Sequence, residues 1–304
     1  MNGPRLGQWC IAALAVPVLA AGCCGPPRVA AHEPEPDRPA ALASIAQRSE
    51  DLRSLSQLES NGTARIPVPR EDGSTAVEQL DLLLVMQRPS RTALRLKLSV
   101  SDVLAWLGSD DQSWWLFLPG RSPSIAYRGP LAGGLSRAQL DSLDEAPVPR
   151  ELRSPRLLWI LAGLEPFGGD VSTAAWDPVM GGWRLEESLA AGSTESIGPV
   201  IRRWFSPNGD QITRVEVLDS TGSTIAASRL SEHVLVEVPD RPMGAWPLVA
   251  RRMTWSTGNA GDHDRAEISL DRPTAQGTRV KPALFDWTRL VESLRPDSII
   301  EVSP

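Results

Sequence analysis

The spacing of hydrophobic positions predicts that the folded part of the chain begins with a helix over residues 40–58. Its apolar side chains recur at steps that fit one face of a 3.6-residue period, at Leu42, Ile45, Leu52, Leu55 and Leu58. Asn61-Gly62 is a turn signal, which we expect to end this helix and to lead into a strand over residues 63–68.

Alternation of apolar and polar residues predicts strands along most of the remaining chain. Leu94 and Leu96 alternate with Arg95 and Lys97, which is the pattern of a strand with one buried face. Further short segments, bounded by Gly, Pro, Asn, Asp or Ser, lie at 77–87, 92–98, 103–107, 113–118, 124–128, 172–176, 183–187, 200–206, 211–219, 223–231, 234–238, 248–256 and 265–270. Strands so closely spaced favour an antiparallel meander over βαβ units.

Two helices are expected in the middle of the chain and one near its end. Ser136 is a candidate N-cap for a short helix that ends at about Leu143. Ser154-Pro155 begins the next one, and its body over residues 157–164 is apolar on all sides. A helix of that kind is buried on most sides and is too short to span a membrane. The last helix ends at about Leu294.

This order of elements predicts a mainly β (α+β) fold, in which one large curved antiparallel sheet is wrapped round a helical plug. No Pro/Gly-rich linker divides the chain after residue 40. We therefore expect residues 40–304 to form a single domain.

The cysteines are confined to the N-terminal segment, at Cys10, Cys23 and Cys24. The rest of the chain therefore has neither a disulfide framework nor a Cys-based zinc site. Arg5 followed by an apolar stretch over residues 9–21 indicates an export signal.

The end of that stretch, Leu19-Ala20-Ala21-Gly22-Cys23, resembles the bacterial lipobox. The resemblance implies a lipoprotein signal peptide over residues 1–22 and a lipidated Cys23 as the first mature residue. The Pro-rich residues 23–39 would then be an extended tether. The alternatives are an ordinary secretory signal that is cut near Ala21 and an uncleaved anchor.

Several segments resemble the LolA/LolB-like lipoprotein-carrier superfamily over roughly residues 40–290, without a long identical motif. The segments that carry the resemblance are the Leu-spaced helix, the Arg88-Pro89 turn between two strands, the Trp-rich hairpin at 114–120, Tyr127-Arg128-Gly129, the late hairpin at 203–217 and the segment 248–255. The resemblance implies a half-barrel of about eleven antiparallel strands, with helices that close its mouth over an apolar cavity.

In that superfamily, LolA-like members carry the acyl chains of lipoproteins across the periplasm, and LolB-like members are outer-membrane lipoproteins that receive them. A lipidated Cys23 makes this chain more similar to the second kind. The resemblance implies a protein anchored in the outer membrane and facing the periplasm, which binds acyl chains of lipids or lipoproteins and has a periplasmic carrier protein as partner.

The candidate ligand-binding residues are apolar side chains suited to lining such a cavity: Leu94, Leu96, Trp106, Trp115, Leu158, Trp159, Leu161, Trp204, Met253 and Trp255. Ordinary core packing is the alternative role for each of them. In the soluble carriers, the Arg of the Arg-Pro turn holds the lid by hydrogen bonds, which makes Arg88 a candidate for that role. The alternative for Arg88 is an exposed turn residue.

Composition argues against most other functions. The net charge of −6 gives no global cationic field for nucleic acid. All but two of the 31 basic residues, Lys97 and Lys281, are Arg, and there are eleven Trp. A codon bias would give the same excess of Arg and Trp. There are three His, and no HExxH, GxSxG, P-loop, GxGxxG or EF-hand motif.

We therefore expect a protein that is not an enzyme, with no catalytic residue, metal site or cofactor. Adjacent side chains of Asp262-His263-Asp264 cannot all face one ion, and the acidic pairs Glu186-Glu187 and Asp144-Glu145 lack a partner base. The alternative function is a non-catalytic envelope binding or sensor module with the same fold and no transport role. An envelope enzyme would instead show polar groups that converge in a cavity.

Overall fold

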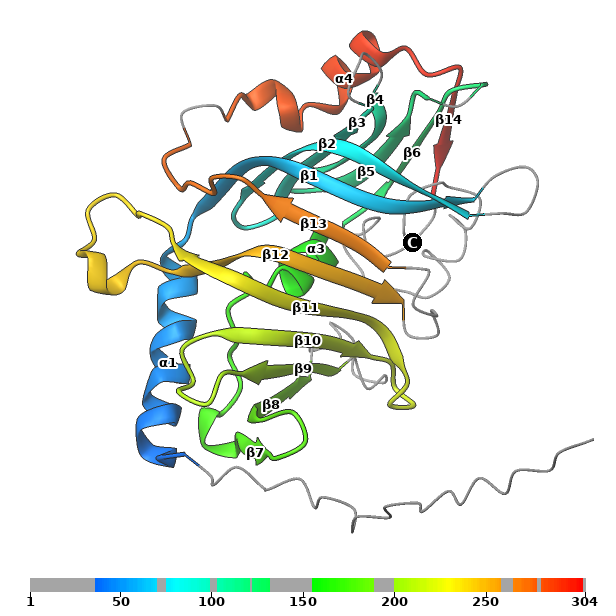
Figure 1. The fold of residues 1–304 in the computed structure, drawn as a ribbon. Coiled ribbons are helices and arrows are strands. Elements are labelled where there is room, and N and C mark those ends of the chain that lie inside the picture. Colours follow the sequence, from blue (N-terminus) through cyan, green and yellow to red (C-terminus); the bar gives the residue numbers. More distant parts are fainter. Residues whose placement is uncertain are drawn as a thin grey trace, which may run out of the picture. The chain divides into compact units, whose positions relative to one another are not determined.

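A computed structural model shows one curved sheet of fourteen strands, with few helices (Figure 1). The structure describes residues 36–69, 75–98, 103–120, 122–131, 155–188, 200–257, 265–277 and 280–302. The chain divides between Glu33 and Pro34, and the fold described below is that of Pro34–Pro304.

The strands follow one another with short connections and a few helical segments. Their bounds are β1 (Gln57–Pro69), β2 (Thr75–Gln87), β3 (Arg91–Lys97), β4 (Val103–Ser109), β5 (Ser113–Leu118), β6 (Ile125–Pro130), β7 (Ala175–Asp177), β8 (Gly182–Ser188), β9 (Val200–Phe205), β10 (Ile212–Leu218), β11 (Thr224–Leu235), β12 (Leu248–Thr257), β13 (Arg265–Leu270) and β14 (Ser298–Glu301). The helices are α1 (Arg38–Ser54), α3 (Pro155–Leu161) and α4 (Trp287–Leu294), with short 3-10 turns η2 (Val171–Thr173), η3 (Met243–Ala245) and η4 (Pro282–Phe285).

The chain enters the sheet in its middle. From β1, strands β2 to β6 extend to one side, and the chain then returns to the other edge, where β7 to β13 lead back to β1. Neighbouring strands pair antiparallel, except that β14 joins β6 in parallel at the sheet edge. The pairing of β1 with β13 therefore joins the two arms of the sheet into one surface.

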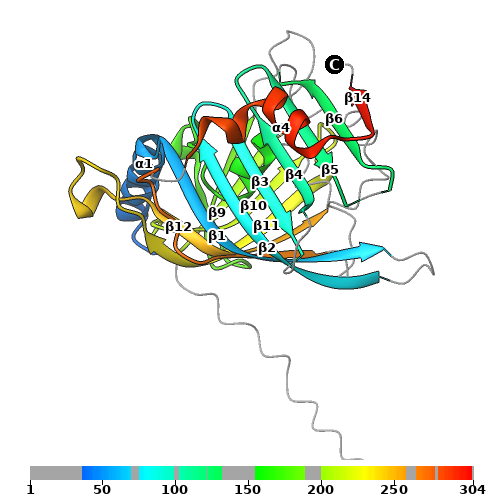
Figure 2. The same cartoon turned by 90° about the horizontal axis from the view of Figure 1, so that it is seen from above.

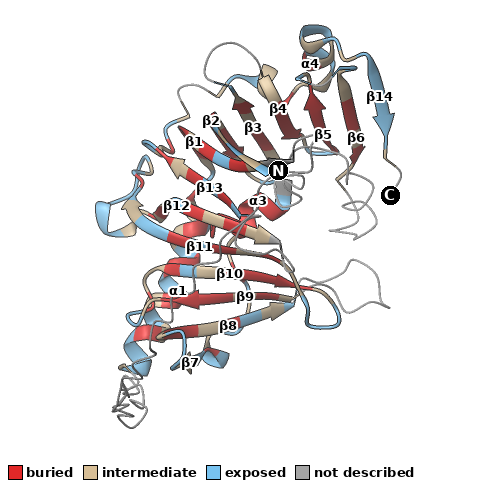
Figure 3. Cartoon of the chain, turned by 45° about the vertical axis from the view of Figure 1, so that its right-hand side comes forward, coloured by how far each residue is buried: buried red, intermediate tan, exposed pale blue. Residues whose placement is uncertain are grey.

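The two faces of the sheet are covered differently. The inner face packs against α1 and α3 and carries the main hydrophobic core (Figure 3). Part of the outer face, over β2 to β6, is covered by η4 and α4 (Figure 2). The antiparallel half-barrel with a helical plug is thus confirmed, but the sheet has fourteen strands where about eleven were expected.

The first helix ends earlier than its leucines suggest. Helix α1 stops at Ser54, Leu55 is its C-cap, and Leu58 already lies in β1. Leu55 and Leu58 are nevertheless fully buried, because the chain turns under the same core. The spacing of Leu55 and Leu58 fits a helix only by coincidence, because the end of α1 and the start of β1 both face the same interior.

Asn61-Gly62 was expected to be a turn and is instead part of β1. The glycine is explained by the neighbouring strand, since a Cβ built on Gly62 would lie 2.0 Å from the carbonyl oxygen of Ser269 in β13. The two strands approach at this point too closely for any side chain.

Other boundaries also differ from the sequence prediction. The segment 223–231 and the start of the segment 234–238 form a single strand, β11, which ends at Leu235 and in which Glu232 has a positive φ of 54°. The segment 172–176 divides into η2 and β7. Strand β14 was not predicted, because its four residues are all exposed and show no alternation.

Some sequence predictions fall outside the described residues. They are the signal peptide and the lipobox with Cys23, the tether up to residue 35, the helix from Ser136 to Leu143, Asp144-Glu145, Ser154 and Asp262-His263-Asp264.

We predict that Gly62→Ala lowers the free energy of unfolding by about 1–3 kcal/mol, the cost of forcing an extra group into a packed site. Both neighbours of β1 hold it by pairing, so the backbone cannot withdraw. Gly244→Ala is the matched control, because a Cβ there meets nothing within 4 Å. Denaturant unfolding measures both variants, and equal stability of the two would contradict the close approach.

Candidate binding site: the inner face and its helical plug

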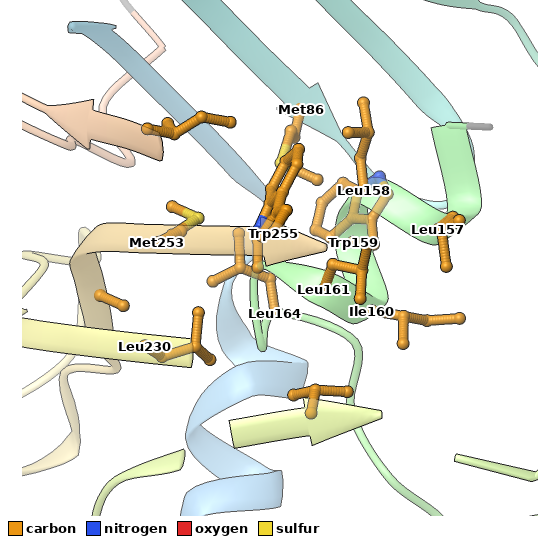
Figure 4. Packing of buried hydrophobic residues seen from close by; sticks show 14 of the residues in the cluster. Met86, Leu157, Leu158, Trp159, Ile160, Leu161, Leu164, Leu230, Met253 and Trp255 are labelled. Carbon is orange, nitrogen blue, oxygen red and sulfur yellow. The ribbon is translucent and has the colours of Figure 1, made fainter. Parts of the chain in front are cut away.

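Helix α3 is buried from Leu157 onward, as the apolar sequence predicts, while Arg156 in its first turn is exposed and lies 4.0 Å from Glu165. Every side chain from Leu157 to Leu164 is almost fully inaccessible to solvent, and Gly163 has none. They belong to the core cluster that includes Leu230, Met253 and Trp255 of the sheet (Figure 4). The helix therefore fills the space inside the curved sheet.

The end of α3 depends on one glycine. Gly163 has a φ of +67°, the left-handed conformation that commonly ends helices. It lets the amide of Leu164 donate to the carbonyl of Trp159 at 2.9 Å. A Cβ on Gly163 would lie 2.7 Å from Leu230 Cδ1, so the sheet also requires a small residue here.

Seven of the ten candidate ligand-binding residues lie together in this inner core. They come from β3, α3 and β12, and they are Leu94, Leu96, Leu158, Trp159, Leu161, Met253 and Trp255. Even-numbered positions of β3 and odd-numbered positions of β12 share the inner face because β-strand side chains alternate.

The other three candidates lie on the outer face. Trp106 and Trp115 pack with Phe117 beneath α4, where the Trp287 ring lies 6.1 Å from that of Trp115 and 4.9 Å from that of Phe117. Trp204 donates from Nε1 to the Asp177 carboxylate at 3.0 Å. The structure does not bring these three side chains to the interior.

Arg88 connects three separate parts of the inner site. Its Nε donates to the carbonyl of Leu55 at 2.9 Å, just after α1, and its Nη2 donates to the carbonyl of Leu164 at 2.7 Å, just after α3. Nη2 also lies 3.5 Å from the carbonyl of Leu52. The guanidinium of the β2–β3 turn thus ties the ends of both helices to the sheet and is not a free surface group.

The same arginine packs on the plug itself. Its guanidinium carbon lies 4.8 Å from the ring centre of Trp159, and Trp159 Nε1 donates to Thr92 Oγ1 at 3.1 Å. Burial lowers the pKa of Arg88, and the Glu165 carboxylate opposes this shift. Thr92 was missed by the sequence analysis because a hydroxyl in a strand gives no signal of its partner.

A buried ion pair lies on the inner face of β8 and β9. Arg203 Nη1 donates to Glu187 Oε2 at 2.6 Å, and the Arg203 guanidinium lies 5.4 Å from the Phe167 ring centre. Burial lowers the pKa of Arg203, while Glu187 raises it. The interior therefore holds this ion pair among its apolar side chains. Sequence analysis missed the pair because charged residues in a strand were expected to face water.

Helix α1 brings a second buried arginine to the sheet. Arg48 donates from Nη2 to the carbonyl of Leu248. Burial lowers its pKa to about 10, against the opposing influence of Asp51 and Asp210. Nearby, His233 Nε2 lies 3.0 Å from the carbonyl of Ile212, and burial lowers the pKa of that ring.

Several buried polar atoms of the interior have no hydrogen-bond partner among the described residues, including two nitrogens each of Arg48 and Arg203. Two uncharged ones, Ser228 Oγ and Trp255 Nε1, belong to directly opposed residues of β11 and β12. An orphaned buried polar group costs free energy. Both atoms could bond a polar group of an otherwise apolar ligand.

Among the described residues, no three His, Cys, Asp or Glu side chains are placed to hold a metal ion. Glu186 and Glu187 point to opposite faces and pair with Arg202 and Arg203, respectively. In the same described part of the chain, no helix is long and apolar enough to cross a bilayer.

No family model matches this chain, and no curated protein matches it. Solved structures do. A DUF1329 family protein from Desulfovibrio piger is 12% identical with a TM-score of 0.50, and the match covers 83% of this chain and 98% of that one.

Two further solved structures are similar at lower TM-scores. A LolA superfamily protein from Nitrosomonas europaea is 10% identical (TM-score 0.41, 77% of this chain and 92% of that one). An outer membrane lipoprotein-sorting protein domain from Vibrio parahaemolyticus is 10% identical (TM-score 0.34, 82% and 97%). At these identities the likeness concerns the fold alone.

Proposed function

We propose that this protein binds the acyl chains of lipids or lipoproteins between α3 and the inner face of the sheet, and that it acts in their carriage or insertion in the cell envelope. The observation that carries the proposal is α3, whose apolar side chains from Leu157 to Leu161 fill the space inside the half-barrel. The fold shared with the structural neighbours supports it.

Binding would exchange one apolar occupant for another. An acyl chain gains about 0.8 kcal/mol for each CH₂ removed from water. The interior is filled by Leu158, Trp159 and Leu161, so a ligand enters only if α3 moves away. The displaced leucines and tryptophan then pack against the acyl chain. Little apolar surface is therefore exposed to water, and the free-energy cost of moving α3 stays low. No catalytic residue is needed.

Arg88 is placed to control that movement. Its hydrogen bonds to the carbonyls of Leu55 and Leu164 hold the two helix ends together over the sheet. Breaking them releases α3 at one end. We therefore assign Arg88 the role of a latch on the plug, as the resemblance of the Arg88-Pro89 turn suggests.

The unpartnered Ser228 Oγ and Trp255 Nε1 suit the ester or amide end of an acylated ligand. A carbonyl oxygen can accept from either group, and Trp255 itself belongs to the hydrophobic cluster of the interior. This arrangement would orient a chain with its polar end near β11 and β12.

The anchor completes the proposal. The lipobox-like sequence before Cys23 suggests a diacylglyceryl-modified, outer-membrane lipoprotein that faces the periplasm and receives its cargo from a periplasmic carrier protein. Two or more acyl chains on one cysteine suffice for stable anchoring.

We predict that Arg88→Gln raises the affinity for a fluorescent fatty acid about tenfold, since the closed state loses hydrogen bonds from a charged donor. Arg91→Gln is the matched control from the same turn, where Arg91 pairs with Asp111 on the surface at 2.8 Å. Fluorescence titration measures both. Equal affinities for the two variants, both folded by circular dichroism, would contradict the latch.

We predict that Cys23→Ser moves the protein from the membrane fraction to the soluble periplasmic fraction and abolishes incorporation of labelled palmitate. Cys24→Ser is the control and should keep both properties, because the small residues stand before Cys23. Retention of Cys23→Ser in the membrane, or loss of label only from Cys24→Ser, would place the anchor elsewhere.

A further inference from the structure

A groove of about 710 Å³ lies on the outer face of the sheet, away from the acyl-chain site. Four arginines line it, Arg65, Arg214, Arg229 and Arg265, together with one carboxylate, Glu267. The whole chain has a net charge of −6, so this cluster of positive charge is local to the groove.

The strand register explains why these side chains meet. Arg214 on β10 lies directly opposite Arg229 on β11, and Arg229 lies opposite Thr254 on β12. Thr254 in turn faces Glu267 on β13, which faces Arg65 on β1. One row of outward side chains thus crosses five strands.

A second row runs beside the first, one step of two residues along the strands. Ala227 on β11 lies opposite Ser256 on β12, and Ser256 lies opposite Arg265 on β13. Small side chains on β11 and β12 therefore form the floor, and long arginines stand on both sides of it. This contrast in side-chain length hollows the groove.

The arginines of the groove differ in their carboxylate partners. Arg65 pairs with Glu267 at 3.2 Å, and Arg214 pairs with Glu216 of its own strand. Arg229 has no carboxylate within 4.0 Å among the described residues and stands opposite another arginine. Like charges in directly opposed positions destabilise a sheet, and a bound anion would offset that cost.

One wall of the groove is held in place by an aromatic side chain. The guanidinium carbons of Arg214 and Arg202 lie 5.3 and 5.7 Å from the ring centre of Trp204. Glu216 accepts from Arg202 and Arg214. Trp204, expected from the sequence to bind acyl chains, instead positions Arg214 at this groove.

We propose that the groove binds a ligand that carries phosphate groups, with phosphate oxygens held between Arg214 and Arg229 on one side and Arg65 and Arg265 on the other. Guanidinium groups bind phosphate in a bidentate manner, and Thr254 and Ser256 supply hydroxyl donors. The volume is that of a small-molecule site and exceeds the need of a single phosphate. The ligand is a phosphorylated lipid headgroup or a soluble polyphosphorylated molecule, which share this chemistry. The proposal does not depend on acyl-chain binding.

The test compares Arg229→Gln with Arg289→Gln, a control that removes one exposed arginine of α4 outside the groove. Both changes are made in the full chain carrying Cys23→Ser, so that no acyl group at that position holds the protein on a membrane. Inorganic tripolyphosphate, titrated by calorimetry, is the soluble probe. Vesicles of phosphatidylcholine with and without phosphatidic acid are the lipid probe.

We expect Arg229→Gln to weaken binding of at least one probe about tenfold or more, and Arg289→Gln to leave it unchanged. Loss with tripolyphosphate assigns a soluble ligand, and loss with phosphatidic acid vesicles alone assigns a headgroup. Without any anion, Arg229→Gln should melt at the same temperature as the parent or above it, because a like-charge pair is removed. Absence of binding to both probes, or an equal effect of the two variants, would overturn the proposal.

Discussion

The burial of the inner face by α3 is the interaction on which the rest of the structure depends. A single curved sheet exposes an apolar surface along β1 to β5 and β8 to β13, and within the described part of the chain no second sheet covers it. Helix α1 covers one end, while α3, with seven residues, fills the middle. An element so small and so apolar has no stable position in water. Helix α3 is stabilised by packing on the sheet, and the apolar inner face of the sheet is kept from water by α3.

This dependence accounts for the polar groups of the interior. The C-terminal ends of α1 and α3 require donors, since helix termini leave carbonyls without intrahelical partners. Arg88 supplies one donor to the chain after α1 and one to the chain after α3. Gly163 allows the turn that ends α3 beside Leu230. Few polar contacts hold α3 in the interior. An acyl chain can therefore take over its contacts with the inner face of the sheet.

The sequence predicted the strands well, because alternation of side chains is a local property, and it predicted the plug from its uniform apolarity. It could not predict which face each strand buries. Trp106 lies opposite Arg95 in the register of β3 and β4, so it faces outward, although Leu94 and Leu96 face inward. The C-terminal α4 covers that outward patch, and nothing local to Trp106 or Trp115 indicates a helix from so distant a part of the chain.

The two faces of the sheet also explain the unusual composition. Trp159 and Trp255 belong to the inner core, Trp106 and Trp115 to the patch under α4, and Trp204 to the wall of the arginine groove. The arginines divide likewise, because Arg88 serves the interior while others gather on the outer strands. Such placements give the excess of Arg and Trp structural uses that composition alone could not show.

The central claim is that acyl chains bind between α3 and the inner face of the sheet. The most direct measurement is photo-crosslinking of a diazirine-labelled fatty acid to the full protein, with the adducts located by mass spectrometry. The account predicts adducts on inner-face residues such as Leu161, Met253 and Trp255. Adducts confined to Trp106, Trp115 and α4, or a protein that binds no fatty acid at all, would contradict it.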